Sequence, residues 1–300
     1  METRIIYLIR YSVELVQKPK GGFQIMRDSE TQDSYRSRLF SDERLEEKAR
    51  LFEAVTLPSL KKVLQRSDSY LVVMTAEGLP AKYQARLEEQ VADLPRATIQ
   101  YFPPIHRFQS VAASAVNSVI SSAPSKRVCI ATVRIDDDDG LADDFGEMVA
   151  EYLRPEFSGF WLSFPMGLRL VKSGRSFTLT QSYMPKIAAG LGKVECLEQS
   201  QIPETAYSIA SHAKIDRREP VIVDARKQAY LRTHHGHNDT NMGSLQWARN
   251  WVQQSAEDEI QAEIAGKSFS ISFEKLGGFK SKSRAKKIFS PVAQLVYRKA

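Results

Sequence analysis

Four consecutive aspartates, Asp136 to Asp139, are the residues of this sequence best suited to chemistry. They directly follow the apolar run Val128 to Ile135, which has the composition of a buried strand. In an extended chain Asp136 and Asp138 point to the same side, about 6.6 Å apart. Adjacent carboxylates repel one another unless they are well solvated or bind a cation. Mg²⁺ and Mn²⁺ prefer oxygen ligands, so the run indicates either a metal site or a solvated acidic turn.

A second polar cluster, residues 233–240, holds His234, His235 and His237, three of the five histidines in the chain. Neutral imidazole is a common metal ligand near physiological pH. The spacing of these three histidines alone is a weak zinc signal. A polar loop in front of a helix explains the cluster equally well.

The first half of the chain predicts the elements that would position these side chains. Short apolar runs alternate with longer amphipathic patterns, which is typical of parallel strands joined by crossover helices. Ligand sites of such sheets lie beyond the carboxyl ends of the strands, and Asp136 stands at such an end. The expected strands are Ile5–Ile9, Tyr70–Met74, Thr98–Phe102 and Val128–Ile135, and the expected helices begin at Ser41 and cover Pro80–Val91, Val111–Ile120 and Asp143–Leu153.

The pattern changes after Pro155. Apolar runs at residues 160–162, 168–171 and 176–179 are separated by turn residues and predict antiparallel hairpins, and residues 244–264 have helical spacing. We therefore expect an α/β fold with a doubly wound, mostly parallel sheet, an antiparallel C-terminal portion and flanking helices. The expected parts are a ligand-binding half at 1–154, a second half at 155–270 and a basic tail at 271–300.

The distribution of charged residues indicates which partners the protein could bind. The net charge of +6 comes from 42 basic and 36 acidic residues, and eight basic residues without an acidic one lie between Lys275 and Ala300. Such a tail suits an anionic membrane surface or a nucleic acid, or it is ordinary solvated surface.

Two cysteines, Cys129 and Cys196, exclude a disulfide-based scaffold and suit a reducing cytosol. With neither a secretory signal nor a long apolar stretch, we expect a cytoplasmic protein.

Several motifs in order resemble the putative rhamnosyltransferase family of bacterial glycosyltransferases, whose members resemble the GT-A fold. An L-F-E triplet followed by L-P-S-L is specific in combination, and R-x-D-x-D-D resembles that family's version of the metal-binding D-x-D. The similarity is clearest over residues 40–145. The motifs are Arg44-Leu45, Arg50-Leu51-Phe52-Glu53, Leu57-Pro58-Ser59-Leu60, Leu79-Pro80, Arg134 to Leu141 and, more loosely, His235 to Thr240.

The resemblance implies roles for individual residues. Asp136 would touch the ribose or a divalent ion, Mn²⁺ or Mg²⁺, Asp138 would ligate the ion, and His235 would complete its shell. Arg10 occupies a basic position suited to nucleotide phosphate, while Arg134 would bind the donor or pair with the acidic run instead. The catalytic base is not identified, and Asp239 is a candidate.

The leading hypothesis is thus a metal-dependent glycosyltransferase that moves a sugar, with rhamnose suggested by the family resemblance, from a nucleotide-sugar donor to a bacterial surface-glycan precursor. The acceptor would be a glycan or a lipid-linked glycan, met by peripheral contact with the inner face of an anionic membrane, and no nucleic acid is expected. Two alternatives stay open. A metal-dependent phosphohydrolase would use the same carboxylates, and a non-catalytic nucleic-acid binder would use the basic tail.

Overall fold

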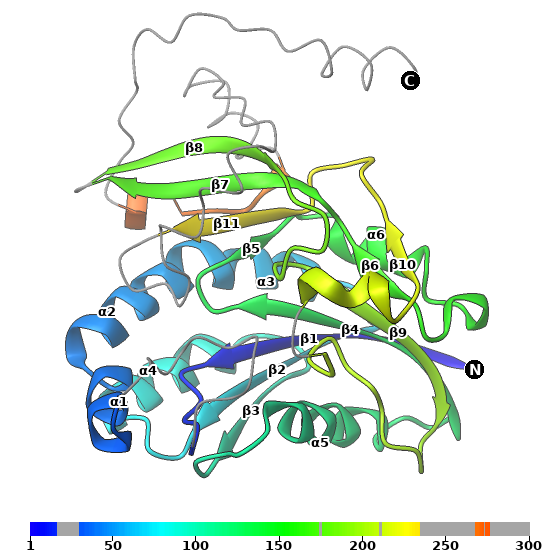
Figure 1. Ribbon diagram of the computed structural model, residues 1–300, viewed down its shortest axis with the longest axis horizontal. Coiled ribbons are helices and arrows are strands. Elements are labelled where there is room, and N and C mark those ends of the chain that lie inside the picture. Colours follow the sequence, from blue (N-terminus) through cyan, green and yellow to red (C-terminus); the bar gives the residue numbers. More distant parts are fainter. Residues whose placement is uncertain (17–29, 174–175, 210–211, 235–267, 273, 277–300) are drawn as a thin grey trace, which may run out of the picture.

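The computed structural model of the chain describes residues 1–16, 30–173, 176–209, 212–234, 268–272 and 274–276. Its main element is a seven-stranded sheet in the order β10-β6-β9-β4-β1-β2-β3 (Figure 1). The strands β1 to β4 run parallel, and β9 is antiparallel to both of its neighbours. The strands are β1 (Glu2–Tyr11), β2 (Ser69–Ala76), β3 (Ala97–Phe102), β4 (Arg127–Asp136), β6 (Trp161–Ser163), β9 (Leu191–Glu198) and β10 (Val221–Val223).

A second sheet of four strands, in the order β5-β11-β7-β8, lies above the main sheet in Figure 1. The strands β7 and β8 form a hairpin, and β11 pairs in parallel with β7 and antiparallel with β5. This sheet draws together segments that are about ninety residues apart in sequence, because β5 precedes the hairpin and β11 follows it. The strands are β5 (Gly140–Leu141), β7 (Met166–Ser173), β8 (Ser176–Tyr183) and β11 (Tyr230–His234).

The helices cover both faces of the main sheet. Side chains of β1 alternate, so that Ile5, Tyr7 and Ile9 join one core cluster while Ile6 and Leu8 join another. The first cluster contains α2, α3, α4 and α6, and the second contains α1 and α5. The helical elements are α1 (Gln32–Leu39), α2 (Asp42–Leu51), a π-helical turn (Phe52–Thr56), α3 (Leu57–Val63), α4 (Ala81–Ala92), α5 (Phe108–Ile120), α6 (Phe145–Ala150) and short 3₁₀ turns at Pro155–Phe157, His212–Arg217 and Glu274–Leu276.

The predicted fold class is confirmed, since the sheet is doubly wound, mostly parallel and flanked by helices, with antiparallel strands in the C-terminal part. One expectation was wrong. Residues 161–163 do not pair with the 168–171 run but enter the main sheet between β9 and β10. The polar stretch before residue 40 also contains α1, which sequence reasoning missed. The expected helix at 244–264 lies outside the described residues.

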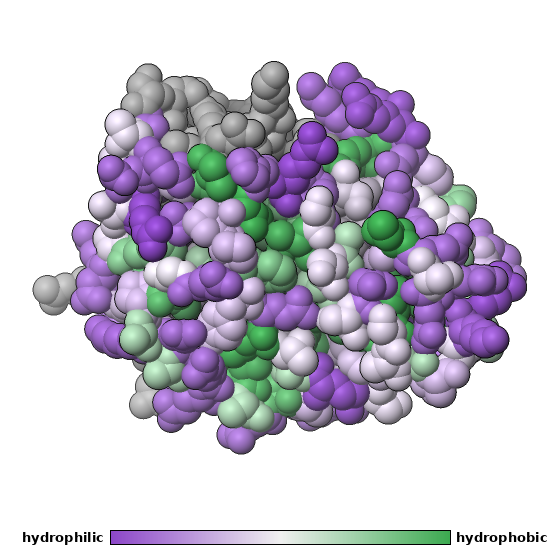
Figure 2. All heavy atoms as spheres, turned by 90° about the horizontal axis from the view of Figure 1, so that it is seen from below, coloured by the Kyte–Doolittle hydropathy of each residue, from purple (hydrophilic) through white to green (hydrophobic). Residues whose placement is uncertain are grey.

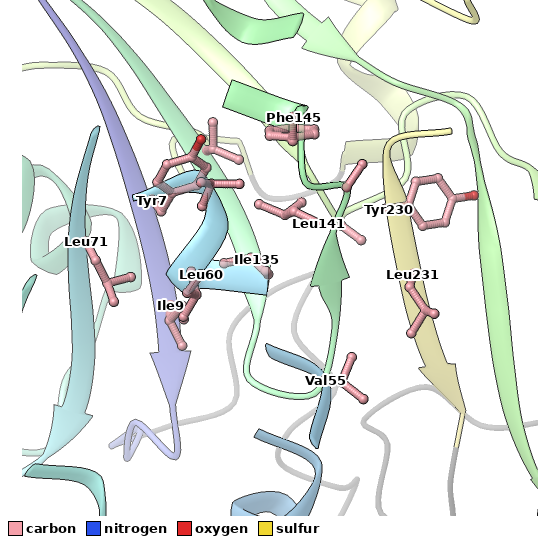
Figure 3. Close-up of a cluster of buried hydrophobic side chains, with 14 of the residues drawn as sticks. Tyr7, Ile9, Val55, Leu60, Leu71, Ile135, Leu141, Phe145, Tyr230 and Leu231 are labelled. Carbon is pink, nitrogen blue, oxygen red and sulfur yellow. The ribbon is translucent and has the colours of Figure 1, made fainter. Parts of the chain in front are cut away.

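The larger core cluster joins the two sheets. Figure 3 shows one cluster of buried side chains that come from both sheets and from α3. Ile9 and Ile135 belong to the main sheet, Leu141 and Leu231 to the second sheet, and Leu60 to α3. All of these side chains are fully buried. Burial of apolar surface on this scale is the main favourable term in folding, so the second sheet is part of the same hydrophobic body.

A proline shapes the helix that reaches this core. Pro58 has no amide hydrogen, so the carbonyl of Ala54 loses its ordinary helical partner four residues on. The helix forms a π-helical turn directly before α3. The amide of Ser272 donates a hydrogen bond of 2.8 Å to the Ala54 carbonyl and replaces the missing helical donor. Pro58 therefore causes a local change of helical pitch within one helical run over residues 42–63 and does not end the helix.

The two cysteines differ from expectation. Cys129 of β4 and Cys196 of β9 are directly opposite in the antiparallel register and form a disulfide bond. The sequence argument excluded a scaffold of several disulfides, but it treated both thiols as reduced. Two cysteines far apart in sequence carry no signal of pairing, and only the contact between β4 and β9 brings them together.

The described surface is mainly polar. Figure 2 shows the underside of the molecule, where hydrophobic side chains appear in separate patches among polar ones. The large hydrophobic residues exposed in the described part of the chain are Met1, Val16, Ile202 and Val223. Among the described residues, no helix combines the length and the apolarity that a bilayer crossing requires.

The contact between β7 and β11 depends on Gly167. A Cβ at this position would lie 2.5 Å from the backbone oxygen of Tyr230, which cannot move without separating the strands. We expect Gly167→Ala to lower the free energy of unfolding by about 1–3 kcal/mol, measured by urea denaturation. Gly192→Ala in β9 is the control, because its nearest contact is a side chain at 3.3 Å. Equal losses in both variants would contradict this reading of the second sheet.

Candidate functional site

The acidic run lies where the parallel strands end. Asp136 is the last residue of β4 and is in register with Arg10 of β1. A terminal nitrogen of Arg10 lies 3.7 Å from Asp136 Oδ1, and one of Arg134 lies 3.5 Å from the same oxygen. The three residues predicted to bind the donor are therefore brought together. Their contacts also match the alternative raised for Arg134, an ion pair with the acidic run.

The two arginines decide the protonation of Asp136. Burial is the largest influence and opposes ionisation, but Arg134 and Arg10 together outweigh it and hold the pKa of Asp136 below its ordinary value. Asp136 is thus a carboxylate at neutral pH. Arg134 also stacks over the ring of Tyr207 at 5.0 Å, which fixes the direction of its guanidinium.

The next three aspartates are not a solvated turn. Asp137, Asp138 and Asp139 are only 2%, 8% and 3% exposed. The amide of Asp139 donates to the carbonyl of Asp136 at 3.2 Å, which closes a tight turn between β4 and β5. Buried carboxylates need compensation from the protein or a bound cation. The interpretation as a solvated acidic turn is therefore wrong.

Lys48 of α2 compensates Asp137. Its ammonium lies 2.5 Å from Asp137 Oδ1, and the two side chains are 13% and 3% exposed. Burial raises the pKa of Asp137 despite this partner. Lys48 was not singled out from the sequence, because a lysine within an amphipathic helix looks like any other solvated charge.

The Lys48–Asp137 pair yields a stability prediction. Removing the cation alone leaves a buried carboxylate uncompensated, so Lys48→Met should cost about 3–5 kcal/mol of unfolding free energy. Asp137→Asn combined with Lys48→Met should recover most of that loss, because no unpaired charge remains. A double-mutant cycle by urea denaturation measures the coupling. If the losses of unfolding free energy from the two substitutions are additive, Lys48 does not compensate the buried charge of Asp137.

Asp139 ties the turn to the second sheet. Its Oδ1 accepts a hydrogen bond of 2.9 Å from the amide of Thr233 in β11. Burial, followed by the negative charge of Asp138, raises the pKa of Asp139 well above its ordinary value. The run is therefore not four equivalent carboxylates. Asp136 lies beside Arg10 and Arg134, Asp137 pairs with Lys48, and Asp139 accepts from the Thr233 amide, and the pair predicted to serve a ligand is Asp136 and Asp138.

His212, in the 3₁₀ turn at His212–Arg217, is a titratable residue that sequence reasoning did not single out. Its Nδ1 lies 2.6 Å from the carbonyl of Lys186, so this nitrogen carries the hydrogen and Nε2 keeps its lone pair. Burial, then the positive charges of Arg134 and Arg232, lowers the pKa of His212 to about 4. The charge of Asp136 acts on it as well, so the imidazole lies within electrostatic reach of the acidic run. A single histidine in a polar segment offered no motif from which to find it.

A pH-dependent stability follows from His212. The unfolded chain takes up a proton at this residue near pH 6.5, whereas the folded chain does so only near pH 4. As the pH falls between these values, wild type should lose stability relative to His212→Gln by up to about 1.4 kcal/mol per pH unit. Above pH 6.5 the difference between the two proteins should be constant. Urea denaturation of both proteins at a series of pH values measures it, and a difference that does not change with pH would contradict the assignment.

The donor set partly suits a divalent ion. Asp136 Oδ1 and Asp137 Oδ2 are buried and have no hydrogen-bond partner in the part of the chain that the structure describes. Carboxylate oxygens that have a cation nearby but no hydrogen bond keep lone pairs that suit a hard cation. Within the same described ranges, however, no three carboxylate, imidazole or thiolate groups are arranged to hold a metal.

The predicted third ligand, His235, and the candidate base, Asp239, lie outside the described residues, as do the basic residues beyond position 276. The neighbouring His234 is described and is buried in β11. Its Nε2 accepts a hydrogen bond of 3.2 Å from Nε of Arg169. His234 is therefore engaged within the second sheet.

Comparison with known proteins identifies the family. Residues 4–246 match the family described as "Putative rhamnosyl transferase", and the chain belongs to it. The resemblance drawn from the D-x-D-like run and the L-F-E and L-P-S-L motifs is confirmed. No curated protein matches the chain.

The solved structures that match this chain are remote in sequence and have low TM-scores. TarS of Staphylococcus aureus in complex with UDP is 10% identical, with 78% of this chain and 61% of that chain covered and a TM-score of 0.37. A putative glucose-1-phosphate thymidylyltransferase of Bacillus anthracis is 12% identical, with 76% and 88% covered and a TM-score of 0.35. HddC of Yersinia pseudotuberculosis is 9% identical, with 77% and 93% covered and a TM-score of 0.32. The chain spans about three fifths of the TarS chains that it matches.

Proposed function

We propose that this protein is a metal-dependent glycosyltransferase that moves a sugar from a nucleotide-sugar donor to a bacterial surface-glycan precursor. The buried acidic run at the end of β4, bordered by Arg10, Arg134 and Lys48, carries the proposal. Family membership supports it, because that family is described as a transferase of rhamnosyl groups. Rhamnose as the sugar, Mn²⁺ or Mg²⁺ as the ion and a lipid-linked acceptor at the membrane are parts of the same proposal.

The proposed reaction exchanges one glycosidic bond for another. The bond between the anomeric carbon and the donor diphosphate breaks, the acceptor oxygen bonds to that carbon, and the hydroxyl proton leaves to a base. Negative charge grows on the departing diphosphate, and a bound divalent ion would stabilise it. Asp136 and Asp138 would hold that ion. Arg10 and Arg134 keep Asp136 ionised in its absence, and the same guanidinium groups would bind phosphate oxygens of the donor.

His212 has a role consistent with this chemistry. An imidazole that stays neutral at physiological pH offers Nε2 as a hydrogen-bond acceptor for a sugar hydroxyl or as a neutral ligand. Its hydrogen bond to the Lys186 carbonyl holds the tautomer. We assign it a positioning role, and the catalytic base remains with the candidate Asp239.

The decisive test removes one carboxylate. Asp138→Asn should abolish the increase in affinity for UDP or dTDP that Mn²⁺ produces, a loss of at least about tenfold or 1.4 kcal/mol. Isothermal titration calorimetry with and without Mn²⁺ measures it. Asp144→Asn, which changes an exposed carboxylate at the start of α6, is the matched control and should bind as wild type does.

Three outcomes would count against the proposal. If Asp138→Asn keeps the Mn²⁺-dependent affinity, the metal assignment is wrong. If wild type hydrolyses phosphoesters without any acceptor, the phosphohydrolase alternative takes its place. If the chain binds nucleic acid with a steep salt dependence and no nucleotide sugar, the binding-module alternative is favoured.

A further inference from the structure

Two arginines lie side by side on the second sheet. Arg169 of β7 and Arg232 of β11 are directly opposite in the parallel register. Leu168 and Leu170, which alternate with Arg169, are buried in the larger core cluster. Side chains of a strand point alternately to its two faces, so the arginine pair occupies the face opposite those leucines.

Within the described residues, Arg169 is buried without a carboxylate partner. Only 5% of it is exposed, and its Nε donates a hydrogen bond of 3.2 Å to Nε2 of His234. In the described part of the chain it makes no ion pair with a carboxylate. Burial, followed by the charge of Arg232, lowers the pKa of Arg169, which shows that its surroundings disfavour the cation. A guanidinium nevertheless stays charged in proteins.

Two other buried cations, Arg4 and Lys193, have carboxylate partners. Arg4 pairs with Glu2 at 2.5 Å, and Lys193 pairs with Glu219 at 2.6 Å. An unpaired buried charge costs several kcal/mol, so an uncompensated guanidinium beside a second one is expensive to keep for stability alone. The arrangement suits a group that supplies negative charge only when it binds.

Arg232 connects this pair to the acidic run. Arg232 is next to Thr233, whose amide donates to Asp139 Oδ1 at 2.9 Å. Arg169 is opposite Arg232 on the neighbouring strand β7, so the arginine pair lies beside the strand segment that contacts the acidic run. The charge of Arg232 also acts on Asp136 and Asp139. The two cations extend the site from the end of β4 toward β7.

We propose that Arg169 and Arg232 form a phosphate-binding subsite beside the acidic run. Two guanidinium groups present planar sets of donors that match phosphate oxygens in pairs. Its place in the reaction rests on the proposed function, under which a phosphate comes either from the donor diphosphate or from a phosphate-bearing acceptor. Binding of phosphate itself does not depend on that function.

The test measures inorganic phosphate binding to the full chain by calorimetry at constant ionic strength. Arg169→Met should weaken phosphate affinity at least tenfold. Arg127→Met removes the same charge at the exposed opposite end of β4 and should leave the affinity unchanged. If Arg169→Met does not fold, Arg232→Gln at the less buried partner replaces it, with the same expectation.

A second arm identifies the source of the phosphate. The titration is repeated with saturating UDP or dTDP and Mn²⁺. Loss of phosphate binding assigns the subsite to the donor diphosphate, and unchanged phosphate binding assigns it to the acceptor. Both results support the subsite.

Failure of the subsite is separable from failure of the proposed function. Equal phosphate affinity in wild type and Arg169→Met, or no phosphate binding by wild type, overturns the subsite even if nucleotide binding depends on Asp138. Conversely, phosphate binding that depends on Arg169 supports the subsite even in a protein that binds no nucleoside diphosphate.

Discussion

The structure depends on how four adjacent carboxylates, three of them buried, are accommodated in one turn. Repulsion within the acidic run and the cost of burial both act against ionisation, and each is relieved by a group from a different element. Arg10 comes from β1, Lys48 from α2 and the Thr233 amide from β11. These elements are far apart in sequence and must converge on one turn. The acidic run is thus both the candidate site and the point at which the two sheets are joined.

The convergence is supported by apolar packing directly behind the turn. Leu141 in β5 and Leu231 in β11 are fully buried in the cluster that also holds Ile9 and Ile135 of the main sheet (Figure 3). The π-helical turn before Pro58 lies against the same region, because a Cβ on Gly140 would meet a methyl group of Val55 at 3.2 Å. A polar turn is therefore held on a rigid hydrophobic base, which is the arrangement that a preorganised binding site requires.

Charge is unevenly distributed around this turn. Arg10 and Arg134 face Asp136, Arg232 and Arg169 continue along the second sheet, and His212 stays neutral between positive neighbours. Carboxylates with basic groups on two sides can receive a divalent ion and a phosphate together. That combination would stabilise a nucleotide-linked leaving group, so the proposed transferase and the proposed phosphate subsite are consistent with each other.

Local patterns in the sequence were enough for the elements of the first half. Apolar runs bounded by turn residues predicted β1 to β4, and the position of Asp136 after such a run predicted its place at the carboxyl end of the sheet. The motifs in residues 40–145 also indicated the family. These features depend on neighbours along the chain, where periodicity and strand length act directly.

Pairing between distant segments was decided only by the tertiary structure. The disulfide between Cys129 and Cys196, the ion pair of Lys48 with Asp137 and the orientation of His212 each join residues separated by tens of positions. The side-by-side placement of Arg169 and Arg232 follows from the parallel pairing of β7 with β11. The sequence around each of these residues does not indicate which distant residue it contacts. A charged side chain needs a partner only when it is buried, and burial arises only when the two sheets pack together.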